Sequence, residues 1–311
     1  ADRIVVIRRG KVVGETTPAE ADKNALAAMM VGRQVNLTVK KKEPQPGELV
    51  FKMENLIVAD KFQNIVVDDV SFEIREGEIL GIAGVQGNGQ TELVEAITGL
   101  TKIASGKITL LGQDISNAAP RKITELGTAH VPEDRQSVGL VLPFPVAENL
   151  VLCTYYQAPF SKGIILQYDA ILEHAEKLIR EFDIRTPSPL TPVASLSGGN
   201  QQKVIIAREL SRPIKFLAAS QPTRGLDVGS IEYIHKCIIQ KRDEGCAVLL
   251  VSPELDEIME LSDRIAVMYR GKILAIVPNK GISKDYIGLL MAGIIPEEPI
   301  QLSGETEIEV T

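Results

Sequence analysis

The chain has 311 residues, of which 44% are hydrophobic and 24% are charged, enough for one substantial core and an appendage. Its formal net charge of −7 at pH 7 argues against a surface that binds nucleic acid, and no apolar run approaches the roughly 18–20 residues of a membrane span. The three cysteines show neither metal-ligand spacing nor a disulfide pattern, which is typical of a reduced, cytoplasmic protein and predicts no metal site.

The first residues predict a strand pair around Gly10, followed by an Ala- and Met-rich helix over 23–30. Residues 1–12 (ADRIVVIRRGKV) align with 262–273 (SDRIAVMYRGKI), and 29–32 align with 290–293 at the same offset without a gap. A fixed long period marks a duplicated unit. Residues 1–37 are therefore expected to be the C-terminal remnant of a preceding, similar domain in a longer protein, with chance similarity of two β-hairpins as the alternative.

Residues 38–48 are charged and rich in Pro and Gly, which is typical of a linker. The range 49–80 then predicts antiparallel strands, and 105–115 predicts a further hairpin around Gly112. Between them, the apolar run 78–83 predicts a buried strand that leads into a glycine-rich loop and a helix over 92–100.

Strand, glycine loop and helix in this order are the context of a P-loop, whose backbone amides cradle phosphates. The loop fits G-x-x-x-x-G-K-[ST] with one departure, because Gln90 stands at the lysine position. A dinucleotide-binding G-x-G-x-x-G would need different glycine spacing. The predicted phosphate-binding residues are Gly84, Gly87, Asn88, Gly89, Gln90, Thr91 and Glu92.

A helical subdomain is predicted over 143–192, where 171–182 has the spacing of an amphipathic helix. The sequence LSGGNQQK follows at 196–203 and precedes a helix over 204–210. The hydroxyl of Ser197 and two glycines allow close approach to an anion, and the helix directs its free N–H groups and positive dipole end toward it. A glycine-rich loop before an ordinary helix is the alternative.

Apolar strands alternate with helices from 215 to 268, as in a parallel sheet, so the predicted fold class is α/β. The strand at 214–219 leads into Ser220 and Gln221, and a later strand at 248–252 leads into Pro253. Residues 295–311 contain several glutamates and predict a mobile acidic tail.

LSGGNQQK is similar to the signature sequence of ABC-type ATPases. With 84–100, VPEDR at 131–135 and QPTRGLD at 221–227, it resembles the second nucleotide-binding domain of the tandem ATP-binding subunit of bacterial ABC importers for simple sugars and nucleosides, above all the nucleoside branch. The resemblance implies a RecA-like P-loop core with a parallel sheet, an antiparallel β subdomain and a helical subdomain within 49–294.

In that family, three features support hydrolysis. They are a P-loop lysine, an acidic pair after the strand that corresponds to 214–219, and a switch histidine after the strand that corresponds to 248–252. Here these positions hold Gln90, Ser220 with Gln221, and Pro253. Because a charge-assisted hydrogen bond contributes roughly 1.5–3 kcal/mol, the resemblance implies weak binding of ATP with Mg²⁺ and almost no turnover by this half alone.

The resemblance assigns further roles. Glu133 takes the Q-loop position that reports to the permease, Asp227 lies in the D-loop, and Phe62 is the candidate ring for stacking on adenine, with an exposed loop aromatic as the alternative. The signature residues serve the ATP that a partner domain holds in a head-to-tail pair, and they are Ser197, Gly198, Gly199, Asn200 and Gln201.

The implied partners are the first nucleotide-binding domain of the same polypeptide, transmembrane permease subunits and, indirectly, a substrate-binding lipoprotein, at the cytoplasmic face of the membrane. Two other functions stay open at this point. One is an ABC domain with ATPase activity of its own, and the other is a soluble ABC protein acting on ribosomes or DNA. The acidic composition and the absence of a long coiled-coil insertion count against the second.

Overall fold

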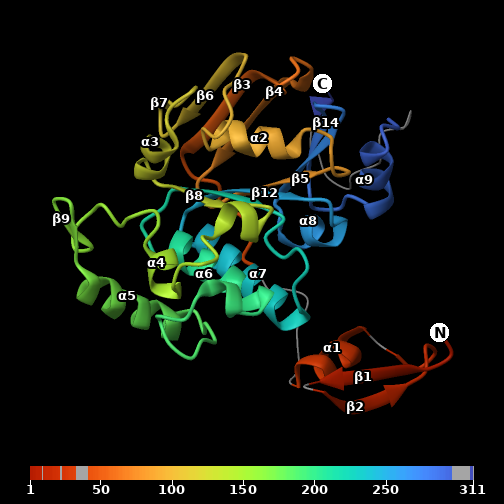
Figure 1. Ribbon diagram of the computed structural model, residues 1–311. Helices are drawn as coiled ribbons and strands as arrows, with labels where there is room; N and C mark the ends of the chain where they lie inside the picture. The colour runs from red at the N-terminus through yellow and green to blue at the C-terminus, as the bar shows by residue number, and fades with distance from the viewer. Residues whose placement is uncertain (9, 22, 33–40, 296–308, 311) are drawn as a thin grey trace.

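A computed structural model describes residues 1–8, 10–21, 23–32, 41–295 and 309–310. Most of the chain forms one body built on two sheets, and the N-terminal elements lie beside it (Figure 1). This body combines a largely parallel sheet with an antiparallel sheet and a helical part, so the predicted α/β fold class is confirmed.

The central sheet has seven strands in the order β15-β14-β13-β5-β12-β11-β8. The strands from β13 to β8 run parallel, whereas β14 and β15 are antiparallel additions at one edge. All residues of β5, β11 and β12 are buried, as expected for parallel strands covered on both faces. The bounds are β5 Ile79–Ala83, β8 Thr128–Val131, β11 Phe216–Ser220, β12 Ala247–Ser252, β13 Arg264–Tyr269, β14 Lys272–Pro278 and β15 Glu309–Val310.

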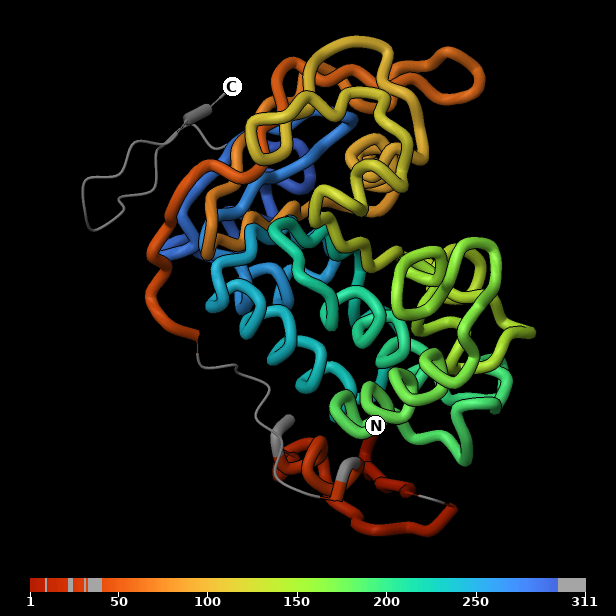
Figure 2. Tube along the Cα trace, turned by 90° about the vertical axis from the view of Figure 1, so that its left-hand side faces the viewer, coloured from red at the N-terminus to blue at the C-terminus, as the bar shows by residue number. Residues whose placement is uncertain are grey.

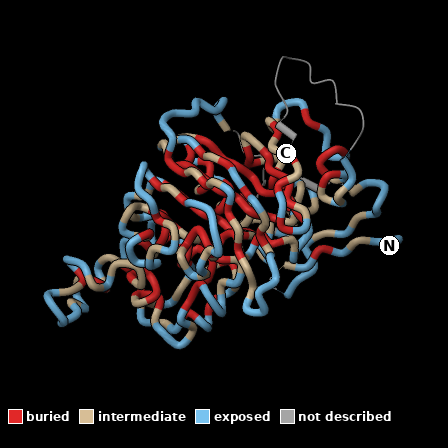
Figure 3. Tube along the Cα trace, turned by 90° about the horizontal axis from the view of Figure 1, so that it is seen from above, coloured by how far each residue is buried: buried red, intermediate tan, exposed pale blue. Residues whose placement is uncertain are grey.

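Two apolar cores lie on opposite faces of this sheet. Phe216 and Ala218 of β11 point into one core, and Leu217 and Ala219 point into the other. Figure 3 shows the buried segments gathered in the middle of the body. Helices α6, α7 and α8 pack against the core that contains Leu217 and Ala219. Helix α2 and the antiparallel sheet cover the other face, with Phe216 and Ala218 (Figure 1). The helices are α2 Gln90–Ile97, α3 Pro120–Glu125, α6 Gly198–Leu210, α7 Val228–Asp243, α8 Leu255–Leu261 and α9 Lys284–Met291.

The antiparallel sheet has the order β4-β3-β6-β7. Phe51 of β3 stacks on Phe216 of β11 with ring centroids 4.5 Å apart, which joins the two sheets through one core. The predicted hairpin around Gly112 is present as β6 and β7. The bounds are β3 Leu49–Ala59, β4 Ile65–Arg75, β6 Ser105–Leu110 and β7 Gln113–Asp114.

The predicted helical segment contains α4 (Val146–Leu150) and α5 (Tyr168–Glu181). The amphipathic spacing is confirmed, because Ala175, Leu178 and Phe182 are buried. Leu172 and Ile179 of the predicted apolar face pack against the same core. The sequence did not predict the small hairpin of β9 (Ser161–Lys162) and β10 (Ile165–Leu166), which projects from this part (Figure 1). A π-helical turn, η1 Arg135–Gly139, precedes the segment, and a 3₁₀ turn, η2 Val193–Ser195, follows it.

At the N-terminus, β1 (Ile4–Arg8) and β2 (Lys11–Thr16) form a two-stranded sheet beside α1 (Lys23–Val31), as predicted. Figure 2 shows this unit at one end of the body, where α1 contacts α7. Among the described strands β1 pairs with β2 alone, whereas its repeat counterpart β13 pairs with β14 on one edge and with β5 on the other. One edge of β1 therefore has no strand beside it in the described residues, and its Ile7 is exposed.

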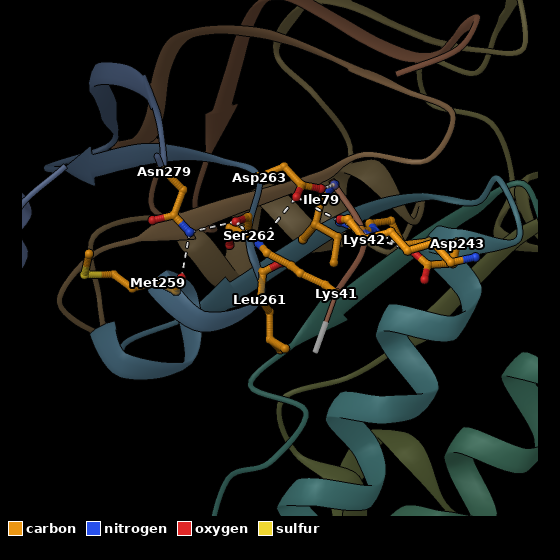
Figure 4. A network of polar contacts seen from close by, with 10 residues as sticks. Lys41, Lys42, Ile79, Asp243, Met259, Leu261, Ser262, Asp263 and Asn279 are labelled. Carbon is orange, nitrogen blue, oxygen red and sulfur yellow. Dashed lines mark hydrogen bonds and ion pairs between the residues drawn. The ribbon is translucent and has the colours of Figure 1, made fainter. Parts of the chain in front are cut away.

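The ends of the predicted linker and tail are described only in part. Residues 38–40 of the linker and 296–308 and 311 of the tail lie outside the described residues. The linker residues that follow run along the body, where Lys41 and the backbone of Lys42 join polar contacts with Arg242 and Asp263 (Figure 4). In the tail, Glu309 and Val310 pair with β14, so this short piece is a strand rather than an unpaired extension.

Candidate functional site: a phosphate loop and a glycine-rich helix start

The predicted P-loop joins the end of β5 to the start of α2, and close packing requires two of its three glycines, Gly84 and Gly89. A Cβ at Gly84 would collide with the amide of Gln90 and lie 2.6 Å from the carbonyl oxygen of Met268. Gly89 has φ 102°, and a Cβ there would collide with the carbonyl oxygen of Val66. Helix α2 begins at Gln90, so the N–H groups of its first turn lack intrahelical acceptors and face the loop.

Gln90 folds back onto the loop instead of reaching outward. Its side-chain oxygen accepts a hydrogen bond from the Asn88 N–H at 3.0 Å, and its amide nitrogen donates to the Val85 carbonyl at 3.1 Å. The side chain is buried and brings no positive charge. One N–H group that could hold a phosphate is thus already bonded.

The turn between β13 and β14 supports the loop from the other side. The Arg270 N–H donates to Asn88 Oδ1 at 2.8 Å, and the Gly271 N–H donates to the Asn88 carbonyl at 2.9 Å. The P-loop is therefore held by a hairpin whose sequence is repeated at the N-terminus.

Glu133 lies beside the start of α2, and three side chains donate to it. Thr91 Oγ1 is 3.2 Å from Glu133 Oε2, while Gln86 Nε2 and Arg224 Nη1 are 2.8 and 2.6 Å from Oε1. Sequence reasoning selected Glu133 and Thr91 but missed Arg224. The sequence signal for Arg224 was its place three residues after Gln221, close to the two positions where the acidic pair had been expected.

The structure brings Ser220, Gln221 and Pro253 together at the carboxyl ends of β11 and β12. Ser220 is buried at the last position of β11, and the Gln221 N–H donates to the Val251 carbonyl at 2.7 Å. A cavity of about 370 Å³ opens here, and its lining includes Gln221, Arg224, His235, Pro253 and Glu257. Neither Ser220 nor Gln221 can act as a carboxylate base, so the chemistry expected at this strand end is absent from both positions.

A second group that sequence reasoning missed fixes the loop after β11 to α8. Thr223 Oγ1 donates to Glu257 Oε1 at 2.6 Å, and His235 Nε2 lies 3.0 Å from the same oxygen. Burial alone would raise the pKa of Glu257, but hydrogen bonds from His235, Thr223 and Ser252 together hold that pKa below its usual value. Thr223, His235 and Glu257 come from distant parts of the sequence, and no spacing rule linked them.

The glycine-rich signature forms the first turn of α6. Sequence reasoning placed the helix after these residues, but α6 begins at Gly198, because Ser197 has the extended backbone of an N-cap. The Ser197 hydroxyl is exposed and accepts a hydrogen bond from Asn200 Nδ2 at 2.9 Å. Gln201 is buried and donates to the Val193 carbonyl at 3.2 Å. The signature thus combines an exposed hydroxyl with a firmly held helix start.

Close packing also ties the signature to the segment that the resemblance names the D-loop. A Cβ at Gly199 would collide with Ser230 Oγ and lie 3.2 Å from Asp227 Oδ2. Asp227 caps α7 by accepting hydrogen bonds from the Ser230 N–H and hydroxyl at 3.0 and 2.8 Å. Both segments line a cavity of about 530 Å³ together with Ile7 and Arg8 of the N-terminal unit.

Phe62 is the predicted site residue that is not joined to the others. It lies in the turn between β3 and β4, its side chain is 72% exposed, and Lys61 Nζ lies 5.1 Å from its ring centroid. Its role in adenine stacking stays a prediction.

The sequence model of the ABC transporter family matches residues 67–224. The chain belongs to the ABC transporter family. A solved structure of a nucleotide-free ATP-binding cassette from an ABC transporter has a TM-score of 0.64 and 24% identity, and the match covers 74% of this chain and 92% of that one. At this identity the likeness shows the fold, and the fold is that of an ABC domain.

Two relatives are similar over most of this chain. The nucleoside import ATP-binding protein NupA of Lactococcus lactis is 52% identical over 293 residues, which are 94% of this chain and 58% of that protein. The guanosine import ATP-binding protein NupO of Bacillus subtilis is 48% identical over 303 residues, 97% of this chain and 59% of the relative. The chain thus spans just under three fifths of the length of these relatives.

ABC ATPases bind ATP together with Mg²⁺. Within the described part of the chain, every helix is too short or too polar to traverse a bilayer.

Proposed function

We propose that this chain is the second nucleotide-binding domain of the ATP-binding subunit of an ABC importer for nucleosides or simple sugars. Residues 1–37 are the end of the first domain, 38–48 are a linker and 49–294 are the second domain. Its own site holds ATP weakly, and its signature completes the ATP site of the first domain. The two relatives named for nucleoside and guanosine import support the nucleoside branch.

The position of the N-terminal hairpin carries this proposal. In the ABC domain, the turn between β13 and β14 holds the P-loop through Asn88. In the repeat counterpart of this hairpin, Ile7 and Arg8 at the end of β1 line the same cavity of about 530 Å³ as Ser197 and Asn200. A first domain attached to this hairpin would bring its own P-loop toward the signature. This arrangement supports a head-to-tail pair in which the signature donates to the partner's ATP.

The free edge of β1 supports the same proposal. The counterpart strand β13 pairs along this edge with β5, the strand that leads into the P-loop. An open edge of this kind favours pairing with another strand. A first domain would supply that strand and would bury the exposed side chain of Ile7.

Exposed apolar side chains support a contact with permease subunits. They gather in the helical part and the turn before it, in the stretch of chain that follows Glu133. Exposed apolar side chains that adjoin one another mark interaction sites on soluble domains. The exposed residues are Val138, Val141, Phe144, Tyr155, Ile164 and Ile165. Contact with a permease would hold the subunit at the cytoplasmic face of the membrane. A substrate-binding lipoprotein on the opposite face would act on the subunit only through the permease.

The weak own site gives a direct test with the purified chain. Because Gln90 carries no charge and Ser220, Gln221 and Pro253 supply no base or switch, we expect no steady-state release of phosphate from ATP above background. Gln90→Lys should tighten ATP binding without restoring turnover, since the base is still missing.

The control is the full-length tandem protein under the same conditions. A turnover number near about 1 s⁻¹ or higher for the isolated chain would contradict the proposal and favour an ABC domain with activity of its own.

A further inference from the structure

The position that Mg²⁺ takes in ABC ATPases is incomplete in this chain. In P-loop proteins the metal is held by the hydroxyl that ends the loop and by an acidic residue at the end of the neighbouring strand. Thr91 supplies the hydroxyl here, but β11 ends in the buried hydroxyl of Ser220. The carboxylate that reaches Thr91 belongs to Glu133, which follows a different strand, β8.

Glu133 is already neutralised by a side chain of the protein. Arg224 Nη1 lies 2.6 Å from Glu133 Oε1, the same oxygen that accepts from Gln86, and Thr91 directs its hydroxyl proton to the other oxygen. A guanidinium cannot lose its proton in a protein, so this charge is permanent. Mg²⁺ needs near-ideal octahedral geometry and gives up water reluctantly. At Oε2 it would displace the hydroxyl proton of Thr91 and would lie close to the positive charge of Arg224, which opposes the binding of a dication.

The backbone holds Arg224 in this position. The Arg224 N–H donates to the Gln221 carbonyl at 3.1 Å, and its own carbonyl accepts from Arg135 Nη1 at 2.8 Å. Gly225 follows with φ 67°, in the left-handed region that turns the chain back into the D-loop segment. The side chain of Arg224 is nevertheless 53% exposed, so it can contact a ligand as well as Glu133.

A guanidinium stands next to the P-loop that has lost its lysine. Arg224 faces the carboxylates of Glu133 and Asp134 and pairs with Glu133 through Nη1, which leaves further N–H donors of the guanidinium for a phosphate. The planar fork of an arginine matches the geometry of phosphate oxygens and binds them through two parallel hydrogen bonds.

We propose that the P-loop of this domain binds nucleotide without a divalent metal, with the guanidinium of Arg224 in the role of the cation. The inference rests on the proposed function, in which this P-loop holds ATP weakly. It gives the degenerate site a distinct ligand, which is the metal-free nucleotide in place of the Mg²⁺ complex.

The test is titration calorimetry of the purified chain with ATP, once with excess MgCl₂ and once with excess EDTA. We expect the two dissociation constants to agree within about threefold, which is a small difference on a scale where tenfold is about 1.4 kcal/mol. Weakening of about tenfold or more in EDTA would overturn the inference and leave the weak ATP site intact. Failure to bind ATP in either buffer would overturn the nucleotide site itself.

Variants at Arg224 separate its role from general effects on folding. Arg224→Gln should weaken ATP binding in EDTA by about tenfold or more, as expected for the loss of one charge-assisted hydrogen bond. The binding that remains should require Mg²⁺, because Glu133 is then free to hold the metal. Arg224→Lys keeps the charge and should keep most of the binding in EDTA. Arg180→Gln on the exposed face of α5 is the matched control and should change neither value. Equal affinity of Arg224→Gln and the parent chain in EDTA would overturn the assignment.

Discussion

Substitution of Ser197 by Arg or of Gly198 by Asp is expected to abolish ATP turnover by the proposed tandem subunit, although neither residue belongs to a P-loop. The Ser197 hydroxyl is exposed at the start of α6, where the helix also directs free N–H groups outward. If this face completes the ATP site of the first domain, its donors stabilise charge that develops on the γ-phosphate. Preorganised donors of this kind contribute roughly 10²–10³ in rate.

The fold of this chain should tolerate both changes. A Cβ at Gly198 would lie 2.8 Å from Arg135 Nη2, the end of a flexible side chain that can move and pair with the new carboxylate. The loss should therefore come from blocked closure of the two domains and from the missing donor. Unchanged melting temperatures of the isolated variants would exclude unfolding as the cause.

The measurement is ATP hydrolysis by the proposed tandem subunit reconstituted with the proposed permease. Gln90→Ala is the contrasting variant, and it should reduce turnover only modestly, because the side chain it removes is bonded within its own loop and contributes no charge. If Gln90→Ala is as damaging as the signature variants, both sites contribute to turnover and the asymmetric arrangement is wrong.

Short-range features of the site could be predicted because their physical requirements are written in neighbouring residues. Gly84 and Gly89 are needed where the backbone passes close to other backbone atoms, and this need fixes their spacing in the sequence. The buried strand before them is a continuous apolar run, so its position could also be predicted from the sequence. The start of α6 was placed too late, because glycines lower helix propensity although an N-cap serine favours a helix at that point.

The contacts that sequence reasoning missed join residues far apart in the chain. Arg224 and Glu133 are separated by 91 positions, and Glu257 meets Thr223 and His235 across separations of 34 and 22. Each pair depends on how strands β8, β11 and β12 are ordered in the sheet. That order could not be inferred from a single sequence. The loss of the acidic pair could be predicted from the sequence, but the contact between Arg224 and Glu133 could be found only from the fold.

A second large effect is expected at Asp263, where the linker meets the body (Figure 4). The carboxylate is 4% exposed and accepts from Arg242 Nη1 and from the Ile79 N–H, each at 2.9 Å. Lys41 Nζ lies 3.4 Å from the same carboxylate and donates to the carbonyls of Leu261 and Ser262 at 3.1 and 2.6 Å. Asp263 therefore joins the linker, the last turn of α7 and the start of β5.

Asp263→Ala should lower the free energy of unfolding by about 3 kcal/mol, the lower end of the range for breaking a buried ion pair. Arg242, whose side chain is 2% exposed, would lose one carboxylate but keep its contact with Asp243 Oδ1 at 2.6 Å. The Ile79 N–H would also lose its acceptor at the first residue of the strand that leads to the P-loop. Urea denaturation followed by circular dichroism measures the change.

Asp243→Ala is the matched control, since it removes the other carboxylate of the same arginine. The Asp243 side chain is 23% exposed and reaches water, so we expect a loss of about 1 kcal/mol or less. The ratio of the two losses is decisive, because both variants delete one acidic partner of Arg242. They differ in burial and in the contacts of Asp263 with Ile79 and Lys41. A loss for Asp263→Ala no larger than that for Asp243→Ala would show that the buried contact between the linker and the body adds little to the stability of the domain.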